Sequence, residues 1–444
     1  MRARRWIGPT LAALAICGWV ARGALRPVAG HATAHRAAVA ARLAGPRKSD
    51  RVLIIAPHCD DESVACGGLI QQAQAVGAQV RVVIITNGDA FRVAAERLFH
   101  TTEVTPEEYI SMGRQRQEES LAALAGLGVS ARQVVFLGYP DGGTAWMWLD
   151  RWESPYASTR TQTDHSPYAN SLRRDAPYRG RSLADDLKSA IAQFRPTLVA
   201  LPHPADKHSD HWAASCHGTA ALYELGLWGK MKTLLYLLHE MDYPYSDPLP
   251  PPREPEAWKA LQLSPSQQEA KHNAISCYRT QLPVLRRFMM EFAAPVEWYC
   301  EARPQELRQL AQGDAVDWRS VPPALSDPPD REGATPPSGD ITSLRVCRVA
   351  HDLRVLIELR SPPASGITYG LHLHALGKDR VSGPMNYVLT PGKESKGITA
   401  KATGHGIEVA LPWSADHVGV MLNADTHGEG KAVDRTRWVT LTTR

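Results

Sequence analysis

The chain has 444 residues, enough for two or three domains of ordinary size. Its hydrophobic content of 43% and charged content of 22% are typical of globular proteins. The net charge is only +4 and no long run of Lys and Arg follows the first five residues, so nucleic acid is not a predicted partner.

The N-terminus has the pattern of an export signal. A basic start, MRARR, precedes a mostly apolar run from Trp6 to Ala21 that is interrupted by Gly8, Pro9 and Thr10. This run is short for a membrane span of about 20 residues. We expect residues 1–25 to be a cleaved signal peptide or an uncleaved membrane anchor. The remainder would then be exported to a periplasmic or extracellular space.

Residues 26–50 are rich in Ala and Arg and are predicted to be a linker or a short helix. An alternation of strands and helices then begins, which indicates a doubly wound, mostly parallel, Rossmann-like α/β sheet over residues 51–302. The predicted strands are 52–56, 80–86, 134–138, 197–201 and 233–239, and the predicted helices are 62–77, 114–128, 182–194, 211–225 and 264–280.

One long stretch of this region, residues 144–180, is rich in Trp and Tyr and shows no periodicity. A loop of that length in a compact domain is usually functional, as a lid or a binding surface. The tryptophans at 146, 148 and 152 would then contribute to such a binding surface, or else pack in the core.

The composition changes after residue 302. Residues 303–340 are proline-rich and are predicted to be an extended linker. Residues 341–444 show short alternating strands separated by turn residues, which predicts a small all-β, sandwich-like domain. The clearest of these strands are 353–359, 368–374, 385–389, 407–411 and 438–441.

Two polar clusters stand out in the α/β region, each directly after a predicted strand. His58-Cys59-Asp60-Asp61-Glu62 follows the first strand, and a run from His203 to His211 with three histidines and two acids follows the fourth. Ligands of open α/β sheets bind at the carboxyl ends of the strands. Capping of a helix N-terminus would explain one or two of the acids but not the histidine.

Together the two clusters offer the ligands of a metal site with open positions. His58, Asp61 and His211 form a set of two histidines and one carboxylate, which suits Zn²⁺ or Fe²⁺. Asp60 could accept a proton from water, and His208 could stabilise an oxyanion or protonate a leaving amine. Asp210 is placed in sequence to orient one of the histidines.

These residues resemble the PIG-L/LmbE-like zinc-dependent N-acetylglucosaminyl deacetylases. The (A/P)HPDDE signature of that family is matched by residues 56–62, with Cys59 in place of proline, and its HxDH signature is matched by residues 208–211. The resemblance implies that His58, Asp61 and His211 bind zinc, that Asp60 is the general base, and that His208 is the oxyanion or acid partner.

Three further matches extend the resemblance over about residues 51–302. Residues 116–119 are similar to the R-x-x-E helix of the family and residues 139–142 to its PDG loop, which implies that Arg116 and Asp141 contact the sugar. The closing K…Y-x-(S/T)-Q…E pattern is matched by Lys271, residues 278–281 and Glu297. The resemblance says nothing about the linker or the β domain.

The function expected from these observations is metal-dependent removal of an N-acetyl group from an amino sugar, as in an N-acetylglucosamine-type glycan or glycoside. Phosphoester hydrolysis is a rival reaction, but it would call for a second metal and more basic residues. The alternative from another class is a non-catalytic glycan-binding protein of the cell envelope with a relic deacetylase domain. We expect the Cys59 thiol to be a spectator.

Overall fold

The structure, a computed structural model, describes residues 41–240, 243–244, 249–311, 315–327, 335–392, 394–395 and 398–443. The expected signal or anchor at residues 1–25 lies outside these ranges. The described chain divides into two compact units, which meet in sequence between Arg303 and Pro304. Within the described ranges, no helix is long and apolar enough to cross a membrane.

The first unit is built on a seven-stranded sheet in the order β3-β2-β1-β4-β5-β7-β6. The strands β1 to β5 are parallel, and β7 is antiparallel to both of its neighbours. The bounds are β1 (Arg51–Ala56), β2 (Gln79–Thr86), β3 (Val134–Tyr139), β4 (Leu198–Pro202), β5 (Lys232–Tyr236), β6 (Lys259–Gln262) and β7 (Val296–Glu301). The aliphatic run of β1 is buried, as expected of a central parallel strand.

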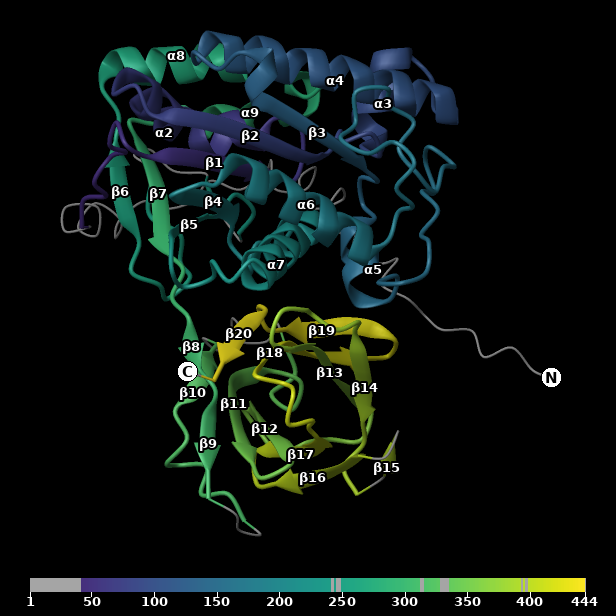
Figure 1. The fold of residues 1–444 in the computed structure, drawn as a ribbon. Coiled ribbons are helices and arrows are strands. Elements are labelled where there is room, and N and C mark those ends of the chain that lie inside the picture. Colours follow the sequence, from purple (N-terminus) through teal and green to yellow (C-terminus); the bar gives the residue numbers. More distant parts are fainter. Residues whose placement is uncertain are drawn as a thin grey trace, which may run out of the picture. The chain divides into compact units, whose positions relative to one another are not determined.

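Helices cover both faces of this sheet (Figure 1). The helices α2, α4 and α8 lie on one face, and α6 and α7 lie on the other. The bounds are α2 (Asp61–Ala75), α3 (Arg92–Phe99), α4 (Pro106–Gly126), α5 (Thr144–Leu149), α6 (Gly180–Phe194), α7 (Ser209–Glu224), α8 (Pro265–Ile275) and α9 (Leu282–Glu291). The predicted doubly wound α/β class is confirmed.

Several elements of this unit differ from the sequence prediction. The helix expected from residue 114 begins at Pro106, because Thr105 and Glu108 form a capping box there. Within the expected loop 144–180, residues 144–149 form α5. The end of the expected linker 26–50 is packed: Leu43 is buried and its N–H donates to Ala260 O of β6 at 2.8 Å.

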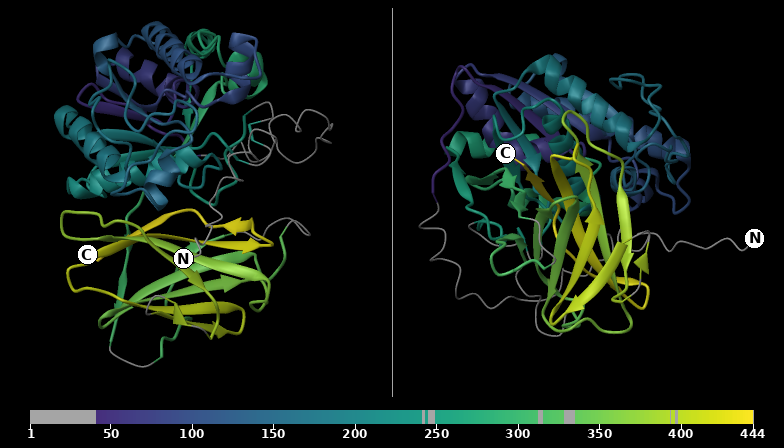
Figure 2. Two further views of the ribbon diagram at one scale, coloured as in Figure 1. Left: turned by 90° about the vertical axis from the view of Figure 1, so that its right-hand side faces the viewer. Right: turned by 60° about the horizontal axis from the view of Figure 1, so that its bottom comes forward.

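The second unit consists of two facing β-sheets (Figure 2). One runs β10-β11-β12-β17-β16-β15, with β9 also paired to β11, and the other runs β14-β13-β18-β20-β8, with β19 paired to β18. Apolar residues of both sheets share one core, so the sandwich-like prediction is confirmed. The bounds are β11 (Ile341–Val349), β12 (Asp352–Leu359), β13 (Ile367–Leu376), β14 (Met385–Leu389), β15 (Glu394–Ser395), β16 (Ile398–Thr403), β17 (Gly406–Pro412), β18 (Gly419–Gly428), β19 (Lys431–Arg435) and β20 (Val439–Thr442).

In its described part, the expected extended linker over residues 303–340 pairs with the β unit. Three short strands lie in it, and each pairs with a strand of the β unit: β8 (Gln305–Glu306), β9 (Arg308–Leu310) and β10 (Pro323–Ser326). Leu307, Val321 and Leu325 between the prolines are buried. These apolar side chains provide the burial that holds a proline-rich segment on a sheet edge.

Candidate functional site

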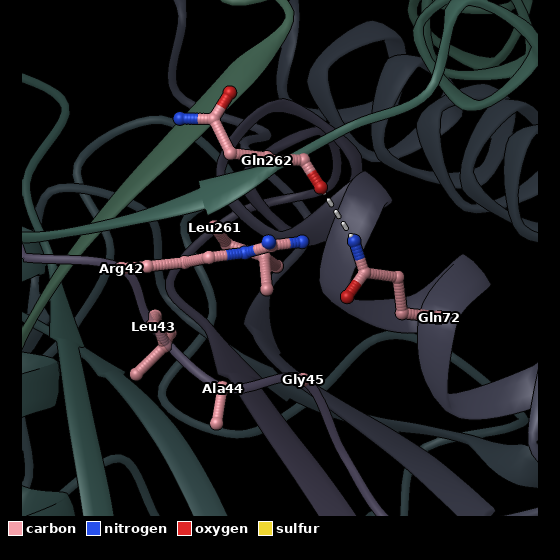
Figure 3. Close-up of a pocket in the computed structure, with 7 residues that line it drawn as sticks. All are labelled: Arg42, Leu43, Ala44, Gly45, Gln72, Leu261 and Gln262. Carbon is pink, nitrogen blue, oxygen red and sulfur yellow. Dashed lines mark hydrogen bonds between the residues drawn. The ribbon is translucent and has the colours of Figure 1, made fainter.

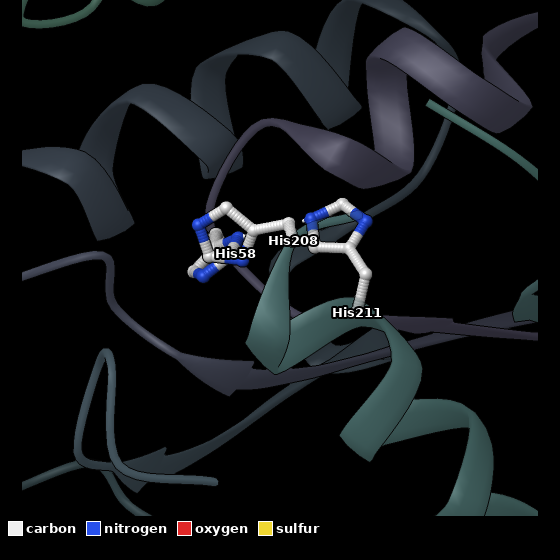
Figure 4. A group of neighbouring side chains, drawn as sticks. All are labelled: His58, His208 and His211. Carbon is white, nitrogen blue, oxygen red and sulfur yellow. Dashed lines mark hydrogen bonds between the residues drawn. The ribbon is translucent and has the colours of Figure 1, made fainter. Parts of the chain in front are cut away.

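The two polar clusters meet at one point of the α/β sheet. The first follows β1 and the second follows β4, and these strands are adjacent. Because β2 lies on the other side of β1, this is the topological switch point, where ligands of doubly wound sheets bind. Figure 4 shows His58, His208 and His211 gathered there, the last two from the start of α7.

Three ligand atoms converge at this point with nearly equal spacing. His58 Nδ1 lies 3.2 Å from Asp61 Oδ2, His211 Nε2 lies 3.3 Å from the same oxygen, and the two nitrogens are 3.3 Å apart. A tetrahedral ion with bonds of 2.0–2.1 Å holds its ligands about 3.3 Å from one another. The arrangement therefore fits a divalent metal, and it matches the predicted set of two histidines and one carboxylate.

The electrostatics of the two histidines also favour positive charge at this point. Burial by itself would lower the pKa of His58, but hydrogen bonds to Asp141, Asp210 and Asp61 outweigh it and raise the pKa well above its usual value. Burial opposes protonation of His211 too, yet the charges of Asp206 and Asp61 raise its pKa to about 10. The acidic groups around both rings therefore favour a cation between these side chains.

Asp60 lies beside this set in a strained backbone conformation. Its φ is 148°, a region that residues other than glycine rarely adopt, and it is the N-cap of α2. The Asp60 N–H donates to Glu62 Oε2 at 3.0 Å, and Tyr278 donates its hydroxyl to Glu62 Oε1 at 2.6 Å. Glu62 therefore holds the loop that presents Asp60, and it is fully buried.

Arg116 is the cation next to Asp60. Its Nη2 donates to Asp60 Oδ2 at 3.0 Å and to Cys59 O at 2.8 Å, and its Nη1 donates to Gly88 O at 2.7 Å. Gly88 has a φ of 63°, which favours glycine, and a Cβ there would lie 1.8 Å from Nη1 and displace the guanidinium. Burial raises the pKa of Asp60 to about 7, with Arg116 opposing the rise and Asp61 adding to it.

Through these contacts Arg116 supports the loops that surround Asp60. The side chain is 4% exposed and holds the strand-exit loops around Asp60. Its expected contact with a sugar stays a prediction, as does that of Asp141. The latter accepts a hydrogen bond from Ala90 N at 2.7 Å, and its Oδ1 lies 3.4 Å from His58 Nε2.

Asp210 joins His58 to the loop after β3. It is fully buried and lies 3.2 Å from His58 Nε2, on the side of the ring away from Asp61. It also accepts hydrogen bonds from Gly142 N at 2.7 Å and from both N–H and hydroxyl of Thr144. Asp210 therefore contacts a histidine of the site, and its orienting role stays a prediction.

His208 lies edge-on to His58, with ring centroids 4.8 Å apart. Burial and the charges of His58 and His211 lower the pKa of His208 well below its usual value. The N–H of Asp210 donates to its Nδ1 at 3.3 Å, so the neutral ring carries its proton on Nε2. His58, His208 and His211 also place one ligand atom each within 4.8 Å of one another.

Two residues of the site were missed in the sequence. Asp206 is fully buried, and its Oδ2 lies 3.2 Å from His211 Nδ1. His239, just past β5, lies 3.1 Å from Asp206 Oδ1 through its Nδ1. The only signal was the position of Asp206 within the second cluster, since nothing in the sequence relates it to residue 239.

The side chains of the remaining candidates are not part of this ligand set. Trp148 and Trp152 are buried and pack against His217, so they are core residues and not a sugar-stacking surface. The Cys59 thiol is buried, and burial raises its pKa well above the usual value.

A pocket of about 370 Å³ in this unit is lined by none of the predicted residues (Figure 3). Its lining is Arg42, Leu43, Ala44, Gly45, Gln72, Leu261 and Gln262.

Comparisons with known proteins point to one family. The family described as PIG-L: GlcNAc-PI de-N-acetylase matches residues 53–222. The 1D-myo-inositol 2-acetamido-2-deoxy-alpha-D-glucopyranoside deacetylases of Mycobacterium bovis and Mycobacterium tuberculosis are each 31% identical over 166 residues, which is 37% of this chain and 48% of theirs. The chain therefore spans about half the length of these curated relatives.

Solved structures give weaker similarities. An antimicrobial A40926 pseudoaglycone deacetylase is 23% identical, with 57% of this chain and 96% of that chain covered and a TM-score of 0.36. The N,N'-diacetylchitobiose deacetylase of Pyrococcus horikoshii is 17% identical, with 57% and 84% covered and a TM-score of 0.36. At these scores they carry no argument about activity. The family match over residues 53–222 includes both polar clusters that meet at the switch point.

Proposed function

We propose that the chain is a metal-dependent hydrolase that removes an N-acetyl group from an amino sugar. The observation that carries the proposal is the convergence of His58 Nδ1, Asp61 Oδ2 and His211 Nε2 within 3.3 Å, with Asp60 next to them. The names of the mycobacterial relatives, which describe deacetylation of an acetamido sugar, support the same substrate class.

His58, Asp61 and His211 hold the metal in this proposal, with Zn²⁺ as the expected ion and Fe²⁺ as the other candidate. A divalent ion bound there supplies a water of lowered pKa and polarises the acetyl carbonyl. Asp210 keeps the His58 ring in position through its contact with Nε2. Asp210 is thereby a positioning residue.

Asp60 is the general base. A pKa near 7 suits a group that must accept a proton from water and then return it at neutral pH. The hydrogen bond from Arg116 fixes which way its carboxylate faces. After attack on the acetyl carbon, Asp60 delivers the proton to the sugar nitrogen as the C–N bond breaks, which releases acetate and the free amine.

His208 stabilises the oxyanion. A neutral ring with its proton on Nε2 is a hydrogen-bond donor. Because the pKa of His208 is lowered, the ring does not readily take up a second proton. This assigns to His208 the first of its two expected roles and leaves the acid role to Asp60. Arg116 and Asp141 remain the proposed contacts to the sugar, with Asp141 the more exposed of the two.

We further propose that the reaction takes place outside the cytoplasm, as the basic and apolar pattern of residues 1–25 predicts. A fusion of residues 1–50 to a reporter that is active only after export tests this. Reporter activity in the periplasm or medium is expected, and a reporter confined to the cytoplasm would contradict export without touching the deacetylase assignment.

The deacetylase proposal is tested by acetate release from a panel of N-acetylated amino sugars, oligosaccharides and simple amides, with the metal content of the protein measured alongside. We expect acetate from amino sugars, loss of activity after chelation and recovery with Zn²⁺ or Fe²⁺. A metal-loaded, folded protein that binds glycans yet releases no acetate would favour the non-catalytic alternative.

A further inference from the structure

Behind the metal ligand His211 lies a second pair of polar residues. Asp206 Oδ2 is 3.2 Å from His211 Nδ1, the ring nitrogen that faces away from Asp61. Asp206 Oδ1 is 3.1 Å from His239 Nδ1. The order from the metal position outward is therefore His211, Asp206, His239, and these residues come from α7, the loop after β4 and the chain just after β5.

The backbone also fixes the Asp206 carboxylate. Its Oδ1 accepts the N–H of His208 at 2.9 Å, and its Oδ2 accepts the N–H groups of Leu238 and His239 at 3.1 and 3.2 Å. Asp206 is fully buried, so a carboxylate in this place depends on such donors. With the imidazoles of His211 and His239 included, five donors surround its two oxygens.

His239 is itself held on its outer side. Its ring stacks on Phe288 of α9, with centroids 5.1 Å apart and an interplanar angle of 16°. It meets the ring of His211 edge-on at 4.5 Å. The Nδ1–H of His239 is therefore directed at Asp206 by packing on two sides.

We propose that Asp206 and His239 are positioning residues that set the affinity of the site for its metal. Asp206 fixes the tautomer and the ring orientation of His211, and His239 fixes Asp206. A carboxylate on the far nitrogen of a metal-binding histidine raises the basicity of the nearer one, and losing such a partner typically weakens metal binding by about 10–100-fold. This inference rests on the proposed metal site.

Asp206, His211 and His239 also satisfy the distance requirement for a metal group of their own. The backbone N–H groups that donate to Asp206 make a second metal ion there unfavourable. Three N–H groups already occupy lone pairs of Asp206, and a second ion would lie next to the first across one imidazole ring. We therefore assign Asp206 and His239 to support of one metal.

The test is zinc affinity of the full chain, measured by competition with a chromogenic chelator, together with zinc stoichiometry and a circular dichroism check of folding. His239→Leu removes the donor to Asp206 and should weaken zinc binding about 10-fold. His239→Asn keeps an N–H donor near the Nδ1 position and should restore most of that affinity. Asp206→Asn should weaken binding more than His239→Leu does.

His427→Leu is the matched control, because His427 also contacts an aspartate, Asp425 at 3.2 Å, but in the β unit. It should leave zinc affinity unchanged. Unchanged affinity in folded His239→Leu, an equal loss in the control, or two zinc ions per wild-type chain would each overturn the inference. If wild-type protein bound no zinc or Fe²⁺ at all, the proposed function would fail instead.

Discussion

The described part of the chain has one cluster of histidine and aspartate at the switch point of the α/β sheet and another on the β unit. In the first, two imidazole nitrogens and one carboxylate oxygen all lie 3.2–3.3 Å from each other. In the second, His372 Nε2 and His427 Nε2 lie 3.0 and 3.2 Å from Asp425 Oδ2. Among the described residues, only the first cluster yields groups whose ligand atoms all lie within 4.8 Å.

The difference is one of convergence and burial, since the residue types are the same. His58, Asp61 and His211 are almost fully buried, whereas the side chain of His427 is 40% exposed. In the β unit the aspartate separates the two rings and pairs with each. A histidine–aspartate cluster thus indicates a metal site only where the fold directs the ligand atoms at one point.

The largest effect should come from removing a ligand of the first cluster. His58→Ala or His211→Ala leaves two of three ligands, so we expect loss of stoichiometric metal and of acetate release. The comparison is His372→Ala, which removes a histidine of the second cluster and should change neither. Elemental analysis of the purified variants measures their metal content. If folded His58→Ala contained as much metal as the wild-type protein, the ligand assignment would be refuted.

Asp60→Asn should separate metal binding from catalysis. The amide cannot accept the proton from water, so turnover should fall about 10³-fold, within the range of general-base contributions. The metal should be retained, because Asp60 is not one of the three converging ligands. Acetate-release kinetics with metal content measured on the same sample test this, and a wild-type rate would show that another group is the base.

Acid should weaken metal binding at the first cluster. At the first, protons compete with the metal for His58 and His211, whose pKa values in the metal-free protein are raised. Metal affinity should therefore fall as the pH falls, by about 10-fold or more per pH unit between pH 8 and 6. Chelator competition at several pH values measures this, and an affinity independent of pH would argue against histidine ligands.

At the second cluster, burial opposes protonation of His372, but Asp425 outweighs it and raises the pKa of this histidine, while the pKa of Asp425 is lowered. Because the pKa of His372 is raised, protonated His372 stabilises the folded β unit. This stabilisation is complete below the usual histidine pKa of 6.5 and is lost as the pH rises through the folded-state pKa. The lowered pKa gives stability that is lost as pH falls below the usual Asp value of 3.8 toward the folded-state pKa.

His372→Gln should therefore destabilise the β unit by about 1 kcal/mol near pH 5.5 and by less at high pH. Hydrogen exchange of the β13 and β18 amides measures the change, with exposed His351→Gln as control. Equal destabilisation at both pH values would indicate that packing, and not charge, is what His372 contributes.

The α/β fold and the convergence of the three candidate ligands could be predicted because they depend on local patterns: buried strands that end in His and Asp residues. Asp206 and His239 could not, since 33 residues separate two side chains that meet only when β4 and β5 pair. The strained φ of Asp60 and the strands at residues 305–326 were also missed. The first depends on Glu62 and Tyr278, and the second on pairing with distant strands of the β unit.

The most direct test is a crystal structure of the protein grown with Zn²⁺, with anomalous diffraction measured at the zinc edge. The account predicts one strong peak about 2.0–2.1 Å from His58 Nδ1, Asp61 and His211 Nε2, and none at His372, Asp425 and His427. A peak at the second cluster, or none at the first in crystals of metal-loaded protein, would contradict it.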